Sequence, residues 1–312
     1  MYEKILVPLD GSVLAEKALL YAKEPAAKLG AEVILVHVCG PEECHCEAER
    51  CYVRPIHRVY VEHTANMFKA ELEAVGARNA EIGWEVLIGD PATEIIRYSK
   101  EKDVSLIIMA THGRSGISRW VMGSVTDKVT RGSVVPVWIV RAFVPDDIPH
   151  SDWPESKILV LLDGSNMAEQ VLPYVAQHAE MSGREVVLLR VCEPPDIESP
   201  FIYYIIQLGY PYTRPLVFED YVAEEMVKWK AAAKEYLVGI EKQLKDDGLK
   251  VESEILVGKP ADEIIDYVGN NPFNLIAMST HGRSGLSRWA LGNTADKVLH
   301  ATSSPILLVR PH

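Results

Sequence analysis

The stretch KILVPLDGSVLAEKALLYA, from Lys4 to Ala22, returns as KILVLLDGSNMAEQVLPYV from Lys157 to Val175. The offset between the two copies is 153 residues, and it still holds at Cys39 and Cys192. Further along the chain the offset is 169, because the second half carries sixteen extra residues in its middle. From Thr111 to Val129, 13 of 19 positions are identical in the second copy. Repetition on this scale indicates that one domain has been duplicated within the chain.

The repeat divides the 312 residues into two domains of ordinary size. We expect a first domain at residues 1–143 and a second at 157–312, with a Pro- and Asp-rich linker at 144–156. The first domain has a Cys/His-rich insertion at about 40–63, and the second has an aromatic-rich insertion at about 194–221.

Short apolar runs alternate with longer helical stretches in both halves. In the first half, KILVPL, EVILVHV, WEVLIG, VSLIIMA and VPVWIV are typical of buried strands. Helices are expected over Val13 to Leu29, over about Val59 to Ala77, from Pro91, and from about Ser124. Strands rich in Val, Ile and Leu that alternate with helices predict a parallel sheet covered on both faces. The predicted fold class is α/β, with two tandem, doubly wound, parallel five-stranded sandwiches.

Composition excludes several classes of protein. The chain is 48% hydrophobic and 24% charged, which is usual for a globular protein. A formal net charge of −12 argues against binding of nucleic acid, whose phosphates require clustered Lys and Arg. The apolar runs are too short to span a bilayer, and the N-terminus reads as a strand and not as a signal peptide. We therefore expect a cytoplasmic protein with its five cysteines mostly reduced.

In such sheets ligands bind beyond the carboxyl ends of the strands. Asp10, in the PLDGS segment, is placed there to accept hydrogen bonds from a ligand. Gly123 and Ser124 introduce a later helix, whose N-terminal N–H groups can bind an anion. Arg114 adds local charge. From the residues alone, phosphate binding stands beside a plainer interpretation in which these glycines are turn and cap residues.

In order and spacing, the segments PLDGS, HGRSG and GSVTDKV resemble the universal stress protein family over nearly all of both halves. The resemblance implies an adenine-nucleotide α-hydrolase-like fold that binds ATP with Mg or Mn and hydrolyses it slowly at most. The family's Gly-rich pattern falls on Ala110, Gly113, Gly123 and Ser124, with Ala in place of the first Gly. We expect adenine near Asp10 and Val38, and phosphates over the glycines.

The nucleotide-binding residues that the resemblance implies occupy matching positions in the two halves. In the first half they are Pro8, Leu9, Asp10, Ser12, Val38, Met109, Ala110, Gly113, Arg114, Gly123, Ser124 and Val125. In the second half they are Leu162, Asp163, Ser165, Val191, Met278, Ser279, Gly282, Arg283, Gly292, Asn293 and Thr294. Because Asn293 replaces the hydroxyl of Ser124, unequal sites are expected, with the first half the better ATP binder.

Function classes other than a nucleotide-dependent stress regulator stay open. No residue is assigned a catalytic role, and His112 with its counterpart His281 is expected to organise the loop. A slow nucleotide hydrolase is one alternative. A metal- or redox-sensing stress protein is another, and it would act through the Cys/His-rich insertion.

Three of the five cysteines fall in that insertion. Clustered Cys and His in a reducing compartment favour metal binding over disulfides. Tetrahedral zinc is the candidate metal. The candidate ligands are Cys44, Cys46, Cys51 and His57, with His45 and His63 as alternates. Redox-responsive thiols and an ordinary exposed loop are the other interpretations.

Two predictions concern assembly. The aromatic-rich insertion is expected to pack within the chain, to contact another subunit, or to cover an apolar ligand. The last strands, VVPVWIV (Val134 to Val140) and SSPILLV (Ser303 to Val309), are expected to pair and form an intramolecular pseudo-dimer. A homodimer of the whole chain also stays open, and the downstream protein partner is unknown.

Overall fold

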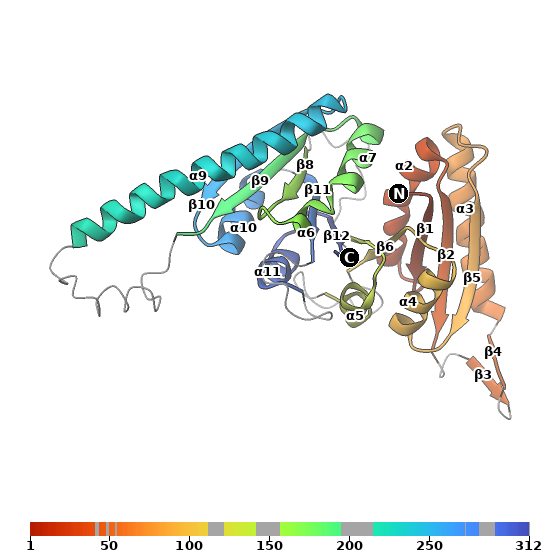
Figure 1. Cartoon of the computed structure of the whole chain (residues 1–312). Coiled ribbons are helices and arrows are strands. Elements are labelled where there is room, and N and C mark those ends of the chain that lie inside the picture. Colours follow the sequence, from red (N-terminus) through yellow and green to blue (C-terminus); the bar gives the residue numbers. More distant parts are fainter. Residues whose placement is uncertain are drawn as a thin grey trace.

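The computed structural model describes residues 1–40, 44–47, 50–53, 55–111, 122–141, 157–194, 215–271, 273–280 and 291–311. Its centre is a sheet of ten strands in the order β10-β9-β8-β11-β12-β7-β6-β1-β2-β5, formed by both halves (Figure 1). The first-half strands are β1 (Lys4–Leu9), β2 (Glu32–Cys39), β5 (Ile82–Ile88), β6 (Leu106–Ala110) and β7 (Val137–Val140). Those of the second half are β8 (Lys157–Leu161), β9 (Val186–Cys192), β10 (Val251–Val257), β11 (Phe273–Ser279) and β12 (Ile306–Val309).

Both halves have the same topology. Within each half all strand pairs are parallel, and the third strand of the half lies beside the second, then the first, fourth and fifth. Strand order therefore reverses between β1 and β6, and again between β8 and β11. The prediction of two tandem, five-stranded, doubly wound parallel units is confirmed.

Helices cover both faces of the sheet. One face packs against α2 (Ala18–Leu29), α3 (Pro55–Ala74), α7 (Leu172–Ser182) and α9 (Pro215–Asp246). The other packs against α4 (Pro91–Glu101), α5 (Ser124–Gly132), α10 (Pro260–Asn270) and α11 (Asn293–Ala301). The short helices α1 (Val13–Glu16) and α6 (Asn166–Glu169) follow β1 and β8. Each of the two hydrophobic cores contains residues from both halves.

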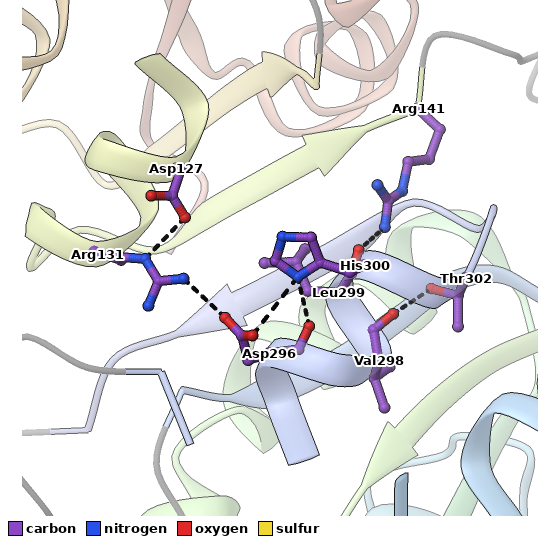
Figure 2. A network of polar contacts seen from close by, with 8 residues as sticks. All are labelled: Asp127, Arg131, Arg141, Asp296, Val298, Leu299, His300 and Thr302. Atoms are coloured by element: carbon purple, nitrogen blue, oxygen red, sulfur yellow. Dashed lines mark hydrogen bonds and ion pairs between the residues drawn. The ribbon is translucent and has the colours of Figure 1, made fainter. Parts of the chain in front are cut away.

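The two halves join through an antiparallel pairing of β7 with β12. The indole of Trp138, on β7, is buried and meets the rings of Tyr21 and His178 edge-on, with ring centroids 5.6 and 5.1 Å away. Figure 2 shows the polar contacts beside this seam, where Arg131 of α5 bonds to Asp127 and to Asp296 of α11, both at 2.8 Å. Also at the seam, the guanidinium of Arg141 donates to the carbonyl oxygen of Leu299 (Figure 2). The predicted intramolecular pairing of the two last strands is confirmed.

Several elements differ from the sequence prediction. The helix expected over Val13 to Leu29 is divided after Glu16, and its second part begins at Ala18. The helix α3 begins at Pro55, four residues before the predicted start. The Cys/His-rich insertion forms a two-stranded hairpin of β3 (Cys44–Glu47) and β4 (Arg50–Val53), which was not predicted.

The largest addition is α9, a helix of 32 residues that takes in the end of the aromatic-rich insertion and extends away from the sheet in Figure 1. Among the residues that the structure describes, none of the helices combines the length and the apolar character needed to cross a membrane. The predicted linker at 144–156 lies outside the described residues.

Candidate nucleotide site

A cavity of about 850 Å³ lies at the carboxyl ends of β8, β9 and β11 in the second half. It is therefore at the point where strand order reverses, which is where open α/β sheets bind their ligands. Its volume is within the usual range of small-molecule sites. Among its lining residues are eight that the sequence predicted: Leu162, Asp163, Val191, Met278, Ser279, Gly292, Asn293 and Thr294.

The turn after β8 is built around one carboxylate. The Oδ1 atom of Asp163 accepts hydrogen bonds from the backbone N–H of Ser165 at 2.9 Å and from its hydroxyl at 2.6 Å. The turn passes through Gly164 at φ +86°, a conformation that L side chains rarely adopt. The turn after β1 is the same, with Ser12 donating to Asp10 at 3.0 and 2.7 Å.

This geometry gives the two serines a local structural role. The hydroxyls of Ser12 and Ser165 also accept from the N–H groups of Ala15 and Ala168, and so cap α1 and α6. Ser165 is not among the described residues that line the cavity. Its assignment to nucleotide binding is a prediction without direct support from this geometry.

The start of α11 forms another wall of the cavity. Gly292 occupies the N-cap position at φ −58° and ψ 148°, and having no side chain it makes no cap hydrogen bond of its own. Its own N–H donates to the carbonyl of Thr280 at 2.9 Å, while the N–H groups of the first helical turn lack partners within the helix. The same holds for α5, where Gly123 is the N-cap residue and donates to Thr111 at 2.6 Å. Both helix starts thus offer N–H groups and a partial positive charge to an anion.

Several lining residues escaped the sequence prediction. Trp229 and Ala232 reach the cavity from α9, and Arg190 reaches it from β9. The α9 residues were missed because they adjoin an insertion for which no helix was predicted. Arg190 could have been found, because it is a charged residue in an apolar strand and directly precedes Val191, a predicted site residue.

In the first half the predicted residues occupy the corresponding strand ends and helix start. Leu9 is buried at the end of β1, and Met109 and Ala110 are buried at the end of β6. Pro8 and Val38 lie on the paired strands β1 and β2. Ser124 is exposed and Val125 half-buried in the first turn of α5.

Part of the prediction falls outside the described residues. This holds for Gly113, Arg114, Gly282 and Arg283, and for His112 and His281. Of the predicted metal ligands, His57 lies on α3, where its Nδ1 is 3.0 Å from Nε2 of His37. The alternate His63 is exposed on the same helix. For the hairpin cysteines only the backbone is placed, and its register pairs Cys46 with Cys51.

The fold is a twice-built, doubly wound α/β sandwich, with a cavity at the point where strand order reverses in its second half. Comparison with known proteins identifies the family. The model of the universal stress protein family matches residues 1–141 and again 155–310. The chain belongs to the universal stress protein family, with two copies of its domain.

The family includes relatives about as long as this chain and relatives about half as long. The chain is 25% identical over 313 residues to universal stress protein Rv2005c of Mycobacterium tuberculosis (strain ATCC 25618 / H37Rv), which covers 98% of this chain and 96% of the relative. It is 35% identical to universal stress protein YxiE of Bacillus subtilis (strain 168) over 149 residues, or 45% of this chain and all of the relative.

The fold is shared with a solved structure along the whole chain. The crystal structure of a universal stress protein from Archaeoglobus fulgidus DSM 4304 superposes with a TM-score of 0.63. The match covers 99% of both chains at 21% sequence identity, and it supports the fold alone.

Proposed function

We propose that the protein binds ATP in both halves and acts as a nucleotide-dependent regulator of a stress response. The observation that carries the proposal is the cavity of about 850 Å³ at the point where strand order reverses in the second half. Its walls are of two kinds, as a nucleotide requires. Leu162, Val191 and Met278 offer apolar contacts to a base, whereas the uncapped start of α11 offers N–H groups to phosphates.

The first half supports an equivalent site. Its Asp10 turn and its uncapped α5 repeat the hydrogen bonds found in the second half. A backbone cradle for phosphate needs no excess of basic residues, which agrees with the net charge of −12. The Mg or Mn ion that accompanies ATP would be carried on the phosphate oxygens.

The sharpest test places a carboxylate at the proposed phosphate site. Gly123→Asp and Gly292→Asp each introduce a good N-cap residue, so helix stability is retained or rises by a few tenths of a kcal/mol. The same carboxylate occupies the N–H groups and repels phosphate. Both glycines have negative φ, near −60°, which Asp adopts without strain.

Equilibrium dialysis with labelled ATP measures the outcome. We expect each single variant to remove one of two binding sites and the double variant to remove both, while melting temperatures stay level or rise. Gly292→Ser is the matched control, because Ser caps the helix without a charge. Undiminished ATP binding by the double variant would refute the proposal.

A further inference from the structure

Three potential metal ligands converge at the carboxyl end of β2 in the first half. His37 and Cys39 are two residues apart on this strand and therefore lie on one face of it. His57 comes from the first turn of α3, which packs on that face. One ligand atom from each side chain lies within 4.8 Å of the other two. His37 and Cys39 are buried, and His57 is half-buried.

The hydrogen bonds of His37 fix which of its nitrogens can bind a cation. Its Nδ1 lies 2.9 Å from the carbonyl oxygen of Leu9, and a carbonyl only accepts, so Nδ1 carries the hydrogen. In the neutral ring the lone pair is then on Nε2, which faces Nδ1 of His57 at 3.0 Å. Metal-binding histidines characteristically donate their second ring N–H to a carbonyl or carboxylate in this way.

The second half carries a permanent cation at the position of His37. At the offset of 153, Arg190 stands in place of His37, and its guanidinium lies 5.0 Å from the ring centroid of Tyr236. In the first half another tyrosine of the equivalent helix, Tyr60, packs edge-on against His37 at 5.8 Å and donates to Glu16 at 2.9 Å.

Two carboxylates lie near each tyrosine. For Tyr60 they are Glu16, which accepts its hydroxyl hydrogen bond, and Asp10. For Tyr236 they are Glu169 and Asp163. In the second half these carboxylates therefore lie near a permanent cation, the guanidinium of Arg190. The first half has two imidazoles and a thiol at this place instead.

We propose that His37 Nε2, Cys39 Sγ and His57 Nδ1 bind one Zn²⁺ ion in the first half. Nitrogen and thiolate ligands suit tetrahedral zinc, with bonds of about 2.0–2.1 Å to nitrogen and about 2.3 Å to sulfur. On binding, the Cys39 thiol loses its proton to solvent and the sulfur–zinc bond forms. The ion supplies the positive charge that Arg190 supplies in the other half.

The position of this site connects it to two other features. Its ligands flank the β3–β4 hairpin, since Cys39 precedes the hairpin and His57 follows it. A water molecule completes the tetrahedron. Leu9, which orients His37, directly precedes Asp10 of the proposed nucleotide site. The metal is thus placed to hold the turn at that site.

Cobalt substitution tests the proposal on the full-length chain. Metal is removed with a chelator, and Co²⁺ and then Zn²⁺ are titrated while thiolate-to-cobalt absorption is recorded. We expect one ion per chain and a thiolate band in the wild type. Cys39→Ser should weaken Zn²⁺ binding by more than about 100-fold, because losing even an outer-shell partner costs about 10- to 100-fold. Cys192→Ser, a change of the buried counterpart in the second half, should leave binding unchanged.

Two further variants keep the proposal falsifiable if Cys39→Ser does not fold. His37→Arg copies the arrangement of the second half and should fold without metal, and His57→Gln changes a half-buried side chain. A triple Cys44, Cys46 and Cys51 change to Ser should retain one ion and the Cys39 thiolate band. The proposal is overturned if the wild type binds no Zn²⁺ at micromolar concentration. It is also overturned if His37→Arg and His57→Gln retain full affinity, or if the triple variant loses the ion altogether.

Discussion

At the scale of single residues, the two proposed nucleotide sites differ most clearly at the first position of one helix. Ser124 begins α5 and Asn293 begins α11, and both side chains are exposed. The glycines before them are alike in conformation and in their hydrogen bonds to Thr111 and Thr280. The helix starts therefore match, and the side chain at this position is a clear variable.

Exchanging these residues should exchange the affinities. We expect Asn293→Ser to strengthen ATP binding in the second half and Ser124→Asn to weaken it in the first. A hydroxyl-to-phosphate hydrogen bond contributes about 1 kcal/mol, so each change should be about fivefold. Calorimetric titration of each change in a chain whose other site carries the Gly→Asp substitution isolates one site at a time. Equal affinities before and after the exchange would contradict this prediction.

At the scale of secondary-structure elements, the halves differ in the helix after the second strand. In the first half this helix is α3, with 20 residues, and in the second it is α9, with 32. The extra turns of α9 precede the part that matches α3, and Trp229, which lines the cavity, stands near the start of that shared part. The two proposed sites therefore differ in the side chains that this helix offers them.

Trp229→Ala tests the contribution of α9. A bound base in contact with this indole would lose about 1 kcal/mol, or about fivefold in affinity, at the second site only. Stability should change little, because Trp229 is 38% exposed. Val238→Ala is the control, since this side chain is 49% exposed on the same helix and does not line the cavity. Equal ATP affinities of the two variants would show that α9 does not contact the ligand.

Elements with a strong local signal could be predicted, whereas contacts between distant elements could not. Buried strands such as VSLIIMA, together with the repeat, sufficed to predict a doubly wound sheet. The β3–β4 hairpin was missed because Cys and His carry no clear strand periodicity. His37 was read as part of an apolar strand, and its meeting with His57 depends on how α3 packs. The Asp10 turn was located, but the capping role of Ser12 emerged only from its hydrogen bonds.

At the scale of the whole molecule, the antiparallel β7–β12 pair turns two domains into one continuous sheet. Its contacts are buried at Trp138 and more exposed at the Arg131–Asp296 pair. Exposed ion pairs contribute little, typically less than about 1 kcal/mol. The apolar seam therefore provides most of the stabilisation between the halves.

Removing the buried indole should weaken both halves together. We expect Trp138→Ala to lower the free energy of unfolding by about 3–5 kcal/mol, because it leaves a cavity between β7, α2 and α7. Arg131→Gln, at the exposed pair, should cost less than about 1 kcal/mol. Chemical denaturation followed by circular dichroism measures both. The prediction is wrong if the two changes have similar effects.

The antiparallel seam also sets the direction of each proposed site. All strands of one half run parallel to β7 and all strands of the other run parallel to β12, so the two sets point opposite ways. The carboxyl ends of the halves therefore lie at opposite margins of the sheet. Two ligands would approach from opposing directions without steric competition. A protein partner that binds at one occupied site would leave the other site accessible.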